Sequence, residues 1–265
     1  ETSVWNDGDV VPIEINEEEG CYNHTMIFGQ LLTGSNYDDE QERIVAGRNG
    51  IGAKACSIFS TKFVVTGCDP NKQKVFTQTW TNNMRSCTDP IIKSCKGKGY
   101  THVTWWPDFK RFGLKGYTTD IIKLYTRYVV DAAMISKVQV YLNDELIPVK
   151  SLTQYSQLYD VPSPEKLLIK TPTCEIVLTP ATQFEAISFV NGIYTRLGGQ
   201  HVDAWSEAIF RPIVDKFNGK DKKVKTKQPK INIGDVRQFF RLFVVATVVR
   251  PEFNGQNKEK LESPG

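Results

Sequence analysis

The chain has 265 residues, of which 40% are hydrophobic and 24% are charged, a balance that excludes disorder throughout and allows a sizeable core. The net charge of +3 is too small for binding to nucleic acid through bulk charge. The longest strongly apolar run, at 242–249, is too short to cross a bilayer as a helix. We therefore expect no transmembrane segment and no membrane partner.

The cysteines follow no metal-binding or redox pattern. Six of them stand at irregular spacings and form no CxxC pair, which argues against a zinc site. The amino-terminal sequence, ETSVW, has neither the basic start nor the apolar stretch of a secretory signal. We expect reduced cysteines and an intracellular protein. The six are Cys21, Cys56, Cys68, Cys87, Cys95 and Cys174.

The first half of the chain predicts short helices and strands in alternation. Helices are expected at 26–33 and 52–59, and strands rich in branched and aromatic residues at 62–67, 74–80 and 102–106. In the stretch 118–135 apolar residues recur every three or four positions, which is the periodicity of an amphipathic helix. Alternation at 138–142, an Asn-Asp turn and apolar residues up to 149 predict a hairpin that ends the first domain.

The second half also predicts a mixture of helices and strands. The polar segment 151–165 contains two prolines and suits a domain boundary, so we expect domains at 1–150 and 151–265. Strands are expected near 167 and at 175–178, 186–190 and 239–249, with a helix at 202–217. Seven lysines and one aspartate lie at 216–230; such a segment can meet phosphates, although it is also typical of a solvated loop.

A glycine-rich segment at 47–54, reading GRNGIGAK, precedes the short helix expected at 52–59. Gly47, Gly50 and Gly52 allow the backbone to approach a ligand closely, and the amino terminus of a helix directs unpaired N–H groups at an anion. Lys54 adds a positive charge. The segment therefore predicts a loop that binds nucleotide phosphates.

Spacing separates this loop from two other phosphate-binding patterns. The P-loop pattern fails because Ala53 stands where its lysine belongs and Ala55 stands where its hydroxyl residue belongs. The dinucleotide pattern GxGxxG/A is met by Gly50, Gly52 and Ala55, with Asp69 lying 19 residues after Gly50. That pattern also needs a buried strand before the loop, whereas 38–43 is highly charged. It stays an alternative.

A third pattern is the glycine-rich lid of the GHKL ATPases. The segments NDG at 6–8, IFGQLL at 27–32, SNYDD at 35–39, GRNGIGAK at 47–54 and IFSTKF at 58–63 occur in the order of the eukaryotic-type type II DNA topoisomerases, and the chain resembles their ATPase region. The segments FVN at 189–191, GG at 198–199 and QNKE at 256–259 are similar to the family's transducer domain. The resemblance implies an α+β chain: a partial GHKL (Bergerat) ATPase fold with a mixed sheet layered with helices, then an S5-like α/β transducer domain.

The resemblance also implies ATP and Mg²⁺ as cofactors and assigns residues to the nucleotide. Asn6 is expected at the adenine, Ser35 and Asn36 at the ribose and phosphates, and Gln256 and Lys258 in a loop that reaches the γ-phosphate. Lys54 and Lys258 are the candidate catalytic cations, because phosphoryl transfer is accelerated by neutralising phosphate charge. The lid itself would supply Gly47, Arg48, Asn49, Gly50, Ile51, Gly52, Ala53 and Lys54.

The implied partners are double-stranded DNA and a second copy of the chain. Lys220, Lys222 and Lys223 stand where relatives carry a basic loop that faces DNA. The family's general-base glutamate and magnesium-holding asparagine precede the NDG turn, and its DNA-cleaving tyrosine follows the transducer domain, so none of them lies in this chain. We therefore expect a fragment of a larger enzyme, without a metal ligand of its own and with negligible ATP hydrolysis.

The implied function is the ATP-driven gate of a type II topoisomerase, in which ATP closes two copies around a DNA duplex and hydrolysis reopens them. The alternatives are another ATPase of this fold, MutL-like or a chaperone, and a nucleotide-dependent dimerisation module without catalysis. Asp9, Val10 and Gly34 depart from animal and fungal enzymes, and the chain looks most like enzymes of large cytoplasmic DNA viruses. That likeness implies the host cytoplasm, whereas a cellular enzyme would be nuclear.

Overall fold

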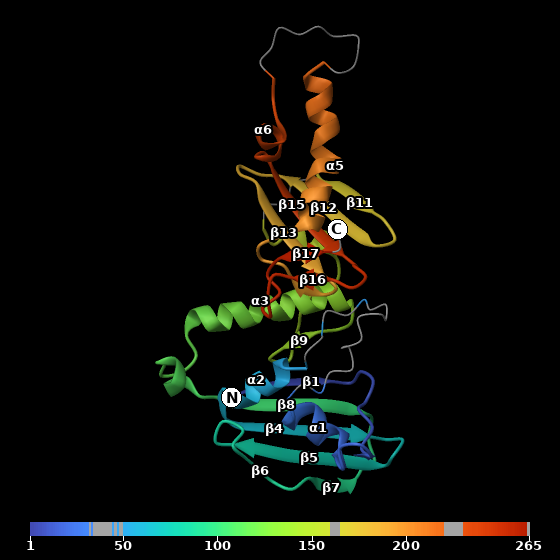
Figure 1. Cartoon of the computed structure of the whole chain (residues 1–265), viewed down its shortest axis with the longest axis vertical. Helices are drawn as coiled ribbons and strands as arrows, with labels where there is room; N and C mark the ends of the chain where they lie inside the picture. The colour runs from blue at the N-terminus through green and yellow to red at the C-terminus, as the bar shows by residue number, and fades with distance from the viewer. Residues whose placement is uncertain are drawn as a thin grey trace. The chain divides into compact units, whose positions relative to one another are not determined.

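The structure is a computed structural model that describes residues 1–31, 33, 44, 47, 50–159, 165–219 and 230–263. The chain forms two compact units, which divide between Thr118 and Thr119 (Figure 1). Each unit has its own sheet and its own buried apolar cluster. They are described separately below.

The first unit is built on a six-stranded sheet with the order β1-β8-β4-β5-β6, in which β7 also pairs with β5. All these pairings are antiparallel. A small hairpin, β2 (Ile15–Asn16) with β3 (Cys21–Tyr22), and a 3-10 turn, η1 (Phe109–Phe112), lie outside the sheet. The strands of the sheet are β1 (Thr2–Asn6), β4 (Ser60–Asp69), β5 (Lys74–Thr81), β6 (Ser86–Cys87), β7 (Ile91–Ser94) and β8 (Tyr100–Pro107).

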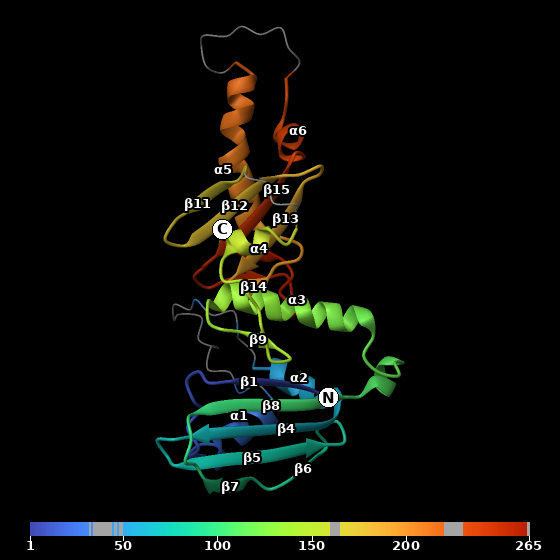
Figure 2. The same cartoon turned by 180° about the vertical axis from the view of Figure 1, so that it is seen from behind.

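Two short helices, α1 (Asn23–Gly29) and α2 (Gly52–Ile58), lie on one face of this sheet (Figures 1 and 2). Side chains alternate between the two faces of a strand, so Phe63 and Val65 of β4 both point to the same side, where they are fully buried. Trp80 of β5 and Phe28 of α1 pack with them. This cluster holds the helices on the sheet.

His24 fits α1 closely against the sheet. Its ring stacks on Phe76 with centroids 4.7 Å apart and is 1% exposed. Gly67 on β4 makes room for the ring, because a Cβ there would lie 2.4 Å from the His24 Nε2. Burial lowers the pKa of His24 to about 4. The helix is thus packed through a neutral imidazole.

Cys68 and Cys95 are joined in a disulfide, so the prediction of six reduced cysteines is wrong for this pair. The two residues are 27 positions apart, and only the pairing of β4, β5 and β7 brings them together. Cys21, Cys56, Cys87 and Cys174 are free thiols.

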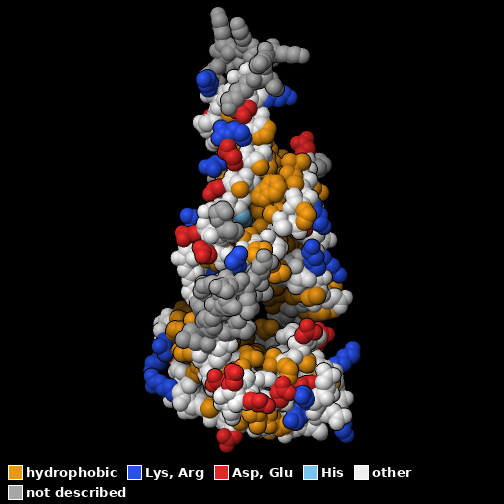
Figure 3. All heavy atoms as spheres, turned by 45° about the vertical axis from the view of Figure 1, so that its right-hand side comes forward, with side chains coloured by type: hydrophobic (Ala, Val, Ile, Leu, Met, Phe, Trp, Pro, Cys, Tyr) orange, Lys and Arg blue, Asp and Glu red, His pale blue; other side chains and the backbone are white. Residues whose placement is uncertain are grey.

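The second unit contains a five-stranded mixed sheet with the order β11-β12-β15-β13-β14. The β13 and β15 strands are parallel, and the other pairs are antiparallel. Apolar side chains are exposed on this unit in the view of Figure 3, and Leu167 and Leu168 of the edge strand β11 are among its exposed apolar residues. The strands are β11 (Leu167–Lys170), β12 (Cys174–Pro180), β13 (Glu185–Val190), β14 (Ile193–Tyr194) and β15 (Phe240–Ala246).

Helices cover both faces of this sheet. Helix α5 (Gln200–Phe217) packs on one face, where Leu242 and Val244 of β15 are buried. Helices α3 (Thr119–Ser136) and α4 (Leu152–Ser156) pack on the other, against Phe243. Because β15 is buried on both faces it reads as a continuous apolar run, which confirms the strand predicted there.

The boundary between the two units depends on helix α3, which belongs to the second unit. Its last turn carries Met134, which packs with Val149, Leu152 and Phe189 in the core of the second unit. The units therefore divide before this helix, whereas the sequence predicts a domain boundary at 150. The apolar stripe of α3 is visible in the sequence, but the sheet that it packs against is not.

Short elements complete the second unit. The hairpin of β9 (Tyr141–Leu142) and β10 (Glu145–Leu146) is present as predicted. Helix α6 (Ile233–Arg237) is not predicted, and it begins with a capping box between Asn232 and Asp235. A second hairpin pairs β16 (Glu252–Phe253) with β17 (Leu261–Ser263). None of the helices in the described ranges has the length and apolar character needed to cross a membrane.

The buried His24 predicts a loss of stability in acid. The unfolded state binds a proton near pH 6.5, whereas the folded state binds it only near pH 4, so stability is fully present above pH 6.5 and falls as the pH drops towards 4. We expect this one group to account for about 3 kcal/mol of the loss. Urea unfolding of the wild type and of His24→Gln at pH 7 and pH 4 measures the difference.

His102→Gln is the matched control, since it removes a half-buried histidine from strand β8 of the same unit. An equal fall in stability for the wild type and His24→Gln between the two pH values would contradict the prediction.

Candidate phosphate-binding site

The glycine loop leads directly into helix α2. Gly50 has a φ of 59°, in the left-handed region that glycine adopts without strain. Helix α2 begins at Gly52, and its first intrahelical bond runs from the Ala55 N–H to the Ile51 carbonyl. The N–H groups that precede Ala55 in this turn have no partner within the helix and are suited to an anion.

Lys54 lies on the first turn of α2 and is 2% exposed. Its Nζ donates to the Oγ1 of Thr33 at 2.8 Å, and no carboxylate of the described residues forms an ion pair with it. Burial lowers the pKa of Lys54, because the charged form loses its hydration.

An ammonium group carries three N–H donors, and Thr33 accepts one of them. A buried cation to which the described residues offer a single neutral acceptor is unfavourable until an anion meets it. The surroundings of Lys54 therefore fit the phosphates of a nucleotide. The sequence reasoning missed Thr33; the signal for it was its place between the resembling segments at 27–32 and 35–39.

Asn6 lies at the end of β1 and is exposed. Its Oδ1 accepts a hydrogen bond from the Gly8 N–H at 3.4 Å, so the NDG turn is formed as its sequence predicts. Asn6 and Lys54 belong to the same unit. The contact of Asn6 with adenine stays a prediction.

Gln256 and Lys258 lie in the loop between β16 and β17. The base of the loop is closed by the Asn254 N–H, which donates to the Lys260 carbonyl at 3.1 Å. Lys258 has a φ of 56° and its N–H donates to the Gly255 carbonyl. Burial lowers the pKa of Lys258. This loop belongs to the second unit, so its reach to the nucleotide also stays a prediction.

The loop is held in place by the Gly-Gly segment at 198–199. The Leu261 N–H donates to the Gly198 carbonyl at 3.0 Å, and Arg196 forms an ion pair with Glu259 at 2.8 Å. Gly199 has a φ of 130°, and a Cβ on it would lie 2.2 Å from the Leu261 carbonyl oxygen. Only glycine fits this contact. The contact therefore explains why the resembling segment at 198–199 has a glycine at its second position.

Seven of the candidate residues lie outside the described residues, and their roles stay predictions. They are Ser35, Asn36, Arg48, Asn49, Lys220, Lys222 and Lys223.

Comparison with known proteins identifies the family. A family model described as DNA gyrase B matches residues 122–265, which is more than half of the chain. The chain belongs to the DNA gyrase B family. Its similarity to type II topoisomerases extends over the first unit as well, because DNA topoisomerase 2 of Invertebrate iridescent virus 6 is 38% identical over 99% of this chain.

Other members of the family support the same placement. DNA topoisomerase 2 of Acanthamoeba polyphaga mimivirus is 39% identical over 98% of this chain. The solved ATPase region of Saccharomyces cerevisiae topoisomerase II superposes with a TM-score of 0.89 and 35% identity, covering 98% of this chain and 68% of that one. The chain spans only 24% and 21% of the two viral relatives. It corresponds to the ATPase region of a type IIA topoisomerase, as the motifs imply.

Membership of the gyrase B family excludes the dinucleotide-binding alternative. The structure also shows that Asp69, which fits the spacing of that pattern, has another role. This carboxylate is buried and accepts hydrogen bonds from the N–H groups of Ile13, Asn71 and Lys72 at 2.9–3.1 Å. Burial alone would raise its pKa, but these three bonds lower it overall. The oxygens of Asp69 hold the chain together and are not available to a ribose.

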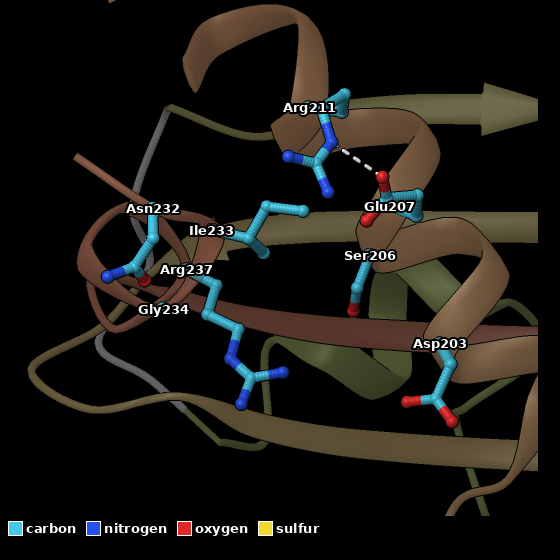
Figure 4. Close-up of a pocket in the computed structure, with 8 residues that line it drawn as sticks. All are labelled: Asp203, Ser206, Glu207, Arg211, Asn232, Ile233, Gly234 and Arg237. Atoms are coloured by element: carbon cyan, nitrogen blue, oxygen red, sulfur yellow. Dashed lines mark hydrogen bonds and ion pairs between the residues drawn. The ribbon is translucent and has the colours of Figure 1, made fainter. Parts of the chain in front are cut away.

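A groove of about 530 Å³ lies between α5 and α6 of this gyrase B family member (Figure 4). Two carboxylates and two guanidinium groups line it, and Glu207 pairs with Arg211 at 2.6 Å. The opposite charges balance, so the groove offers no net attraction to a polyphosphate. It contains none of the residues that the motifs assign to the nucleotide.

Gly199→Ala is expected to displace the hairpin that carries Lys258. The added Cβ clashes with the backbone of Leu261 and meets an unfavourable φ, which together cost about 2–3 kcal/mol. Chemical unfolding measures this loss. Gly116→Ala serves as the control because no atom lies within 4 Å of its Cβ position and the expected change is within about 0.5 kcal/mol. Equal stability of the Gly199→Ala and Gly116→Ala variants would contradict the predicted clash between residue 199 and the backbone of Leu261.

Proposed function

We propose that this chain is the nucleotide-operated gate of a type II DNA topoisomerase, and that it binds ATP with Mg²⁺ and couples hydrolysis to the passage of one DNA duplex through another. The observation that carries the proposal is the buried Lys54, to which the described residues offer one hydroxyl acceptor and no carboxylate, on the first turn of the helix that follows the glycine loop. The similarity to type II topoisomerases, which extends over 99% of this chain, supports it.

The chemistry proposed for these residues is binding and charge neutralisation. Lys54 and the lid N–H groups meet the phosphate oxygens, and Lys258 meets the terminal phosphate and so distinguishes ATP from ADP. Such groups accelerate phosphoryl transfer by stabilising charge on the transferred group. Lys258 suits this role because it is half-buried and its backbone is fixed by the closed hairpin.

Mg²⁺ enters the proposal through the family likeness. Among the residues that the structure describes, no three His, Cys, Asp or Glu side chains gather into a metal site. We assign no metal ligand among these residues. The general base is proposed to come from the segment that precedes the NDG turn in relatives.

The proposed partners are double-stranded DNA and a second copy of the chain. Lys220, Lys222 and Lys223 lie in the sequence between α5 and α6, and a lysine-rich segment of this kind binds phosphates without reading the base sequence. The viral relatives favour the host cytoplasm as the location, and a nuclear location follows if the source is cellular.

Lys258→Ala tests the proposed role at the γ-phosphate. In a form of the protein that contains the whole ATPase region, we expect DNA-stimulated ATP turnover to fall by about 100-fold, because one charge-stabilising donor is lost. Affinity for a non-hydrolysable ATP analogue should fall more than affinity for ADP. Lys260→Ala, an exposed neighbour on the same hairpin, is the control and should retain turnover. Full activity of Lys258→Ala would contradict the proposal.

Lys220→Ala, Lys222→Ala and Lys223→Ala test the contact with DNA. For each lysine that meets a phosphate, the slope of log K against log salt concentration for duplex binding should become shallower by about 0.9. Fluorescence anisotropy with duplexes of two unrelated sequences should show equal losses. Lys98→Ala, in the first unit, is the control. Unchanged slopes in all three variants would place the DNA contact elsewhere.

A further inference from the structure

The Nζ of Lys54 is held by a neutral partner. The Thr33 Oγ1 accepts its hydrogen bond at 2.8 Å, and the same hydroxyl donates to the Gln30 carbonyl in a longer contact of 3.5 Å. Gln30 is the C-cap residue of α1, directly after its last residue, Gly29. The hydroxyl hydrogen is therefore engaged by the end of α1, and a lone pair of the oxygen faces the ammonium group.

The choice of partner matters for the charge of the site. A carboxylate in the place of Thr33 would fix the lysine but cancel its charge, and a methyl group would leave the buried ammonium without its partner among the described residues. A hydroxyl accepts one N–H and leaves the positive charge intact. The arrangement keeps Lys54 fixed and still able to attract an anion.

The contact also joins two parts of the nucleotide site that are 21 residues apart. Thr33 follows α1, and Lys54 belongs to α2, so the bond ties the chain before the glycine loop to the helix after it. A lysine side chain has several rotatable bonds, and holding it in one geometry before the ligand arrives reduces the entropy lost on binding.

We propose that Thr33 is a positioning residue for phosphate binding: its hydroxyl fixes the Nζ of Lys54 and leaves the other two N–H donors for a phosphate oxygen of the nucleotide. This inference rests on the proposed function of the glycine loop as an ATP lid. Thr33 itself makes no contact with the nucleotide in this role.

Isothermal titration with a non-hydrolysable ATP analogue and with adenosine tests the proposal in a form of the protein that contains the whole ATPase region. Thr33→Val keeps the shape of the side chain and removes the hydroxyl, and we expect it to weaken the ATP analogue about tenfold while adenosine binding is unchanged. Thr33→Ser restores the hydroxyl and should bind the analogue within about twofold of the wild type.

Lys54→Met separates the inference from the function on which it rests. It should weaken the ATP analogue at least as much as Thr33→Val, and Thr33→Val should have no further effect in the Lys54→Met background. If Lys54→Met binds normally, the proposed phosphate site is wrong. If Lys54→Met loses affinity but Thr33→Val does not, or if Thr33→Val weakens adenosine equally, the positioning role is overturned and the proposed function stands.

The pH dependence supplies a readout that a merely structural role would not change. Removing the acceptor makes the ammonium form of Lys54 less favourable, so its pKa, already lowered by burial, should fall further in Thr33→Val. The loss of ATP-analogue affinity on the alkaline side should then begin at a lower pH than in the wild type and in Thr33→Ser. An identical alkaline limb in all three proteins would also overturn the proposal.

Discussion

A buried ammonium group is the constraint around which the first unit is organised. Lys54 is taken out of water on the first turn of α2, where the described residues offer it a hydroxyl and no carboxylate. Removing a charge from water is costly unless hydrogen bonds or an opposite charge compensate. The helices α1 and α2 must therefore be placed so that Thr33 reaches the Nζ, and the packing of Phe28 and His24 on the sheet fixes α1 in that position.

The main constraint in the second unit is different: the loop between β16 and β17 must be held in one conformation. Its five-stranded sheet is covered on both faces, by α5 on one side and by α3 and α4 on the other. This core supports the Gly-Gly segment at the start of α5, and the backbone of Gly199 meets Leu261 so closely that no side chain fits between them. The hairpin that carries Lys258 is thus fixed at its base by backbone contacts, which is a suitable support for the contact that we propose between Lys258 and a phosphate.

In both units, the functional interpretation of a short sequence feature depends on the residues that surround it in the fold. The NDG turn, the hydroxyl of Thr33 and the Gly-Gly segment are each common in loops. Asp69 shows the converse, because its spacing from Gly50 fits a dinucleotide pattern but its carboxylate is fully engaged by backbone N–H groups. A motif therefore predicts chemistry only when the donors and acceptors it supplies are left free by the fold.

The sequence by itself determined the features that depend on neighbouring residues. The glycine loop, the amphipathic periodicity of α3 and the apolar run of β15 are local patterns, and their elements lie where those patterns predict. Only the tertiary structure decided which distant groups meet: Thr33 with Lys54, Cys68 with Cys95, and α3 with the sheet of the second unit. The physical reason is that these contacts depend on the order and register of strands and on which face of a sheet a helix covers, and neither is encoded in the periodicity of a single segment.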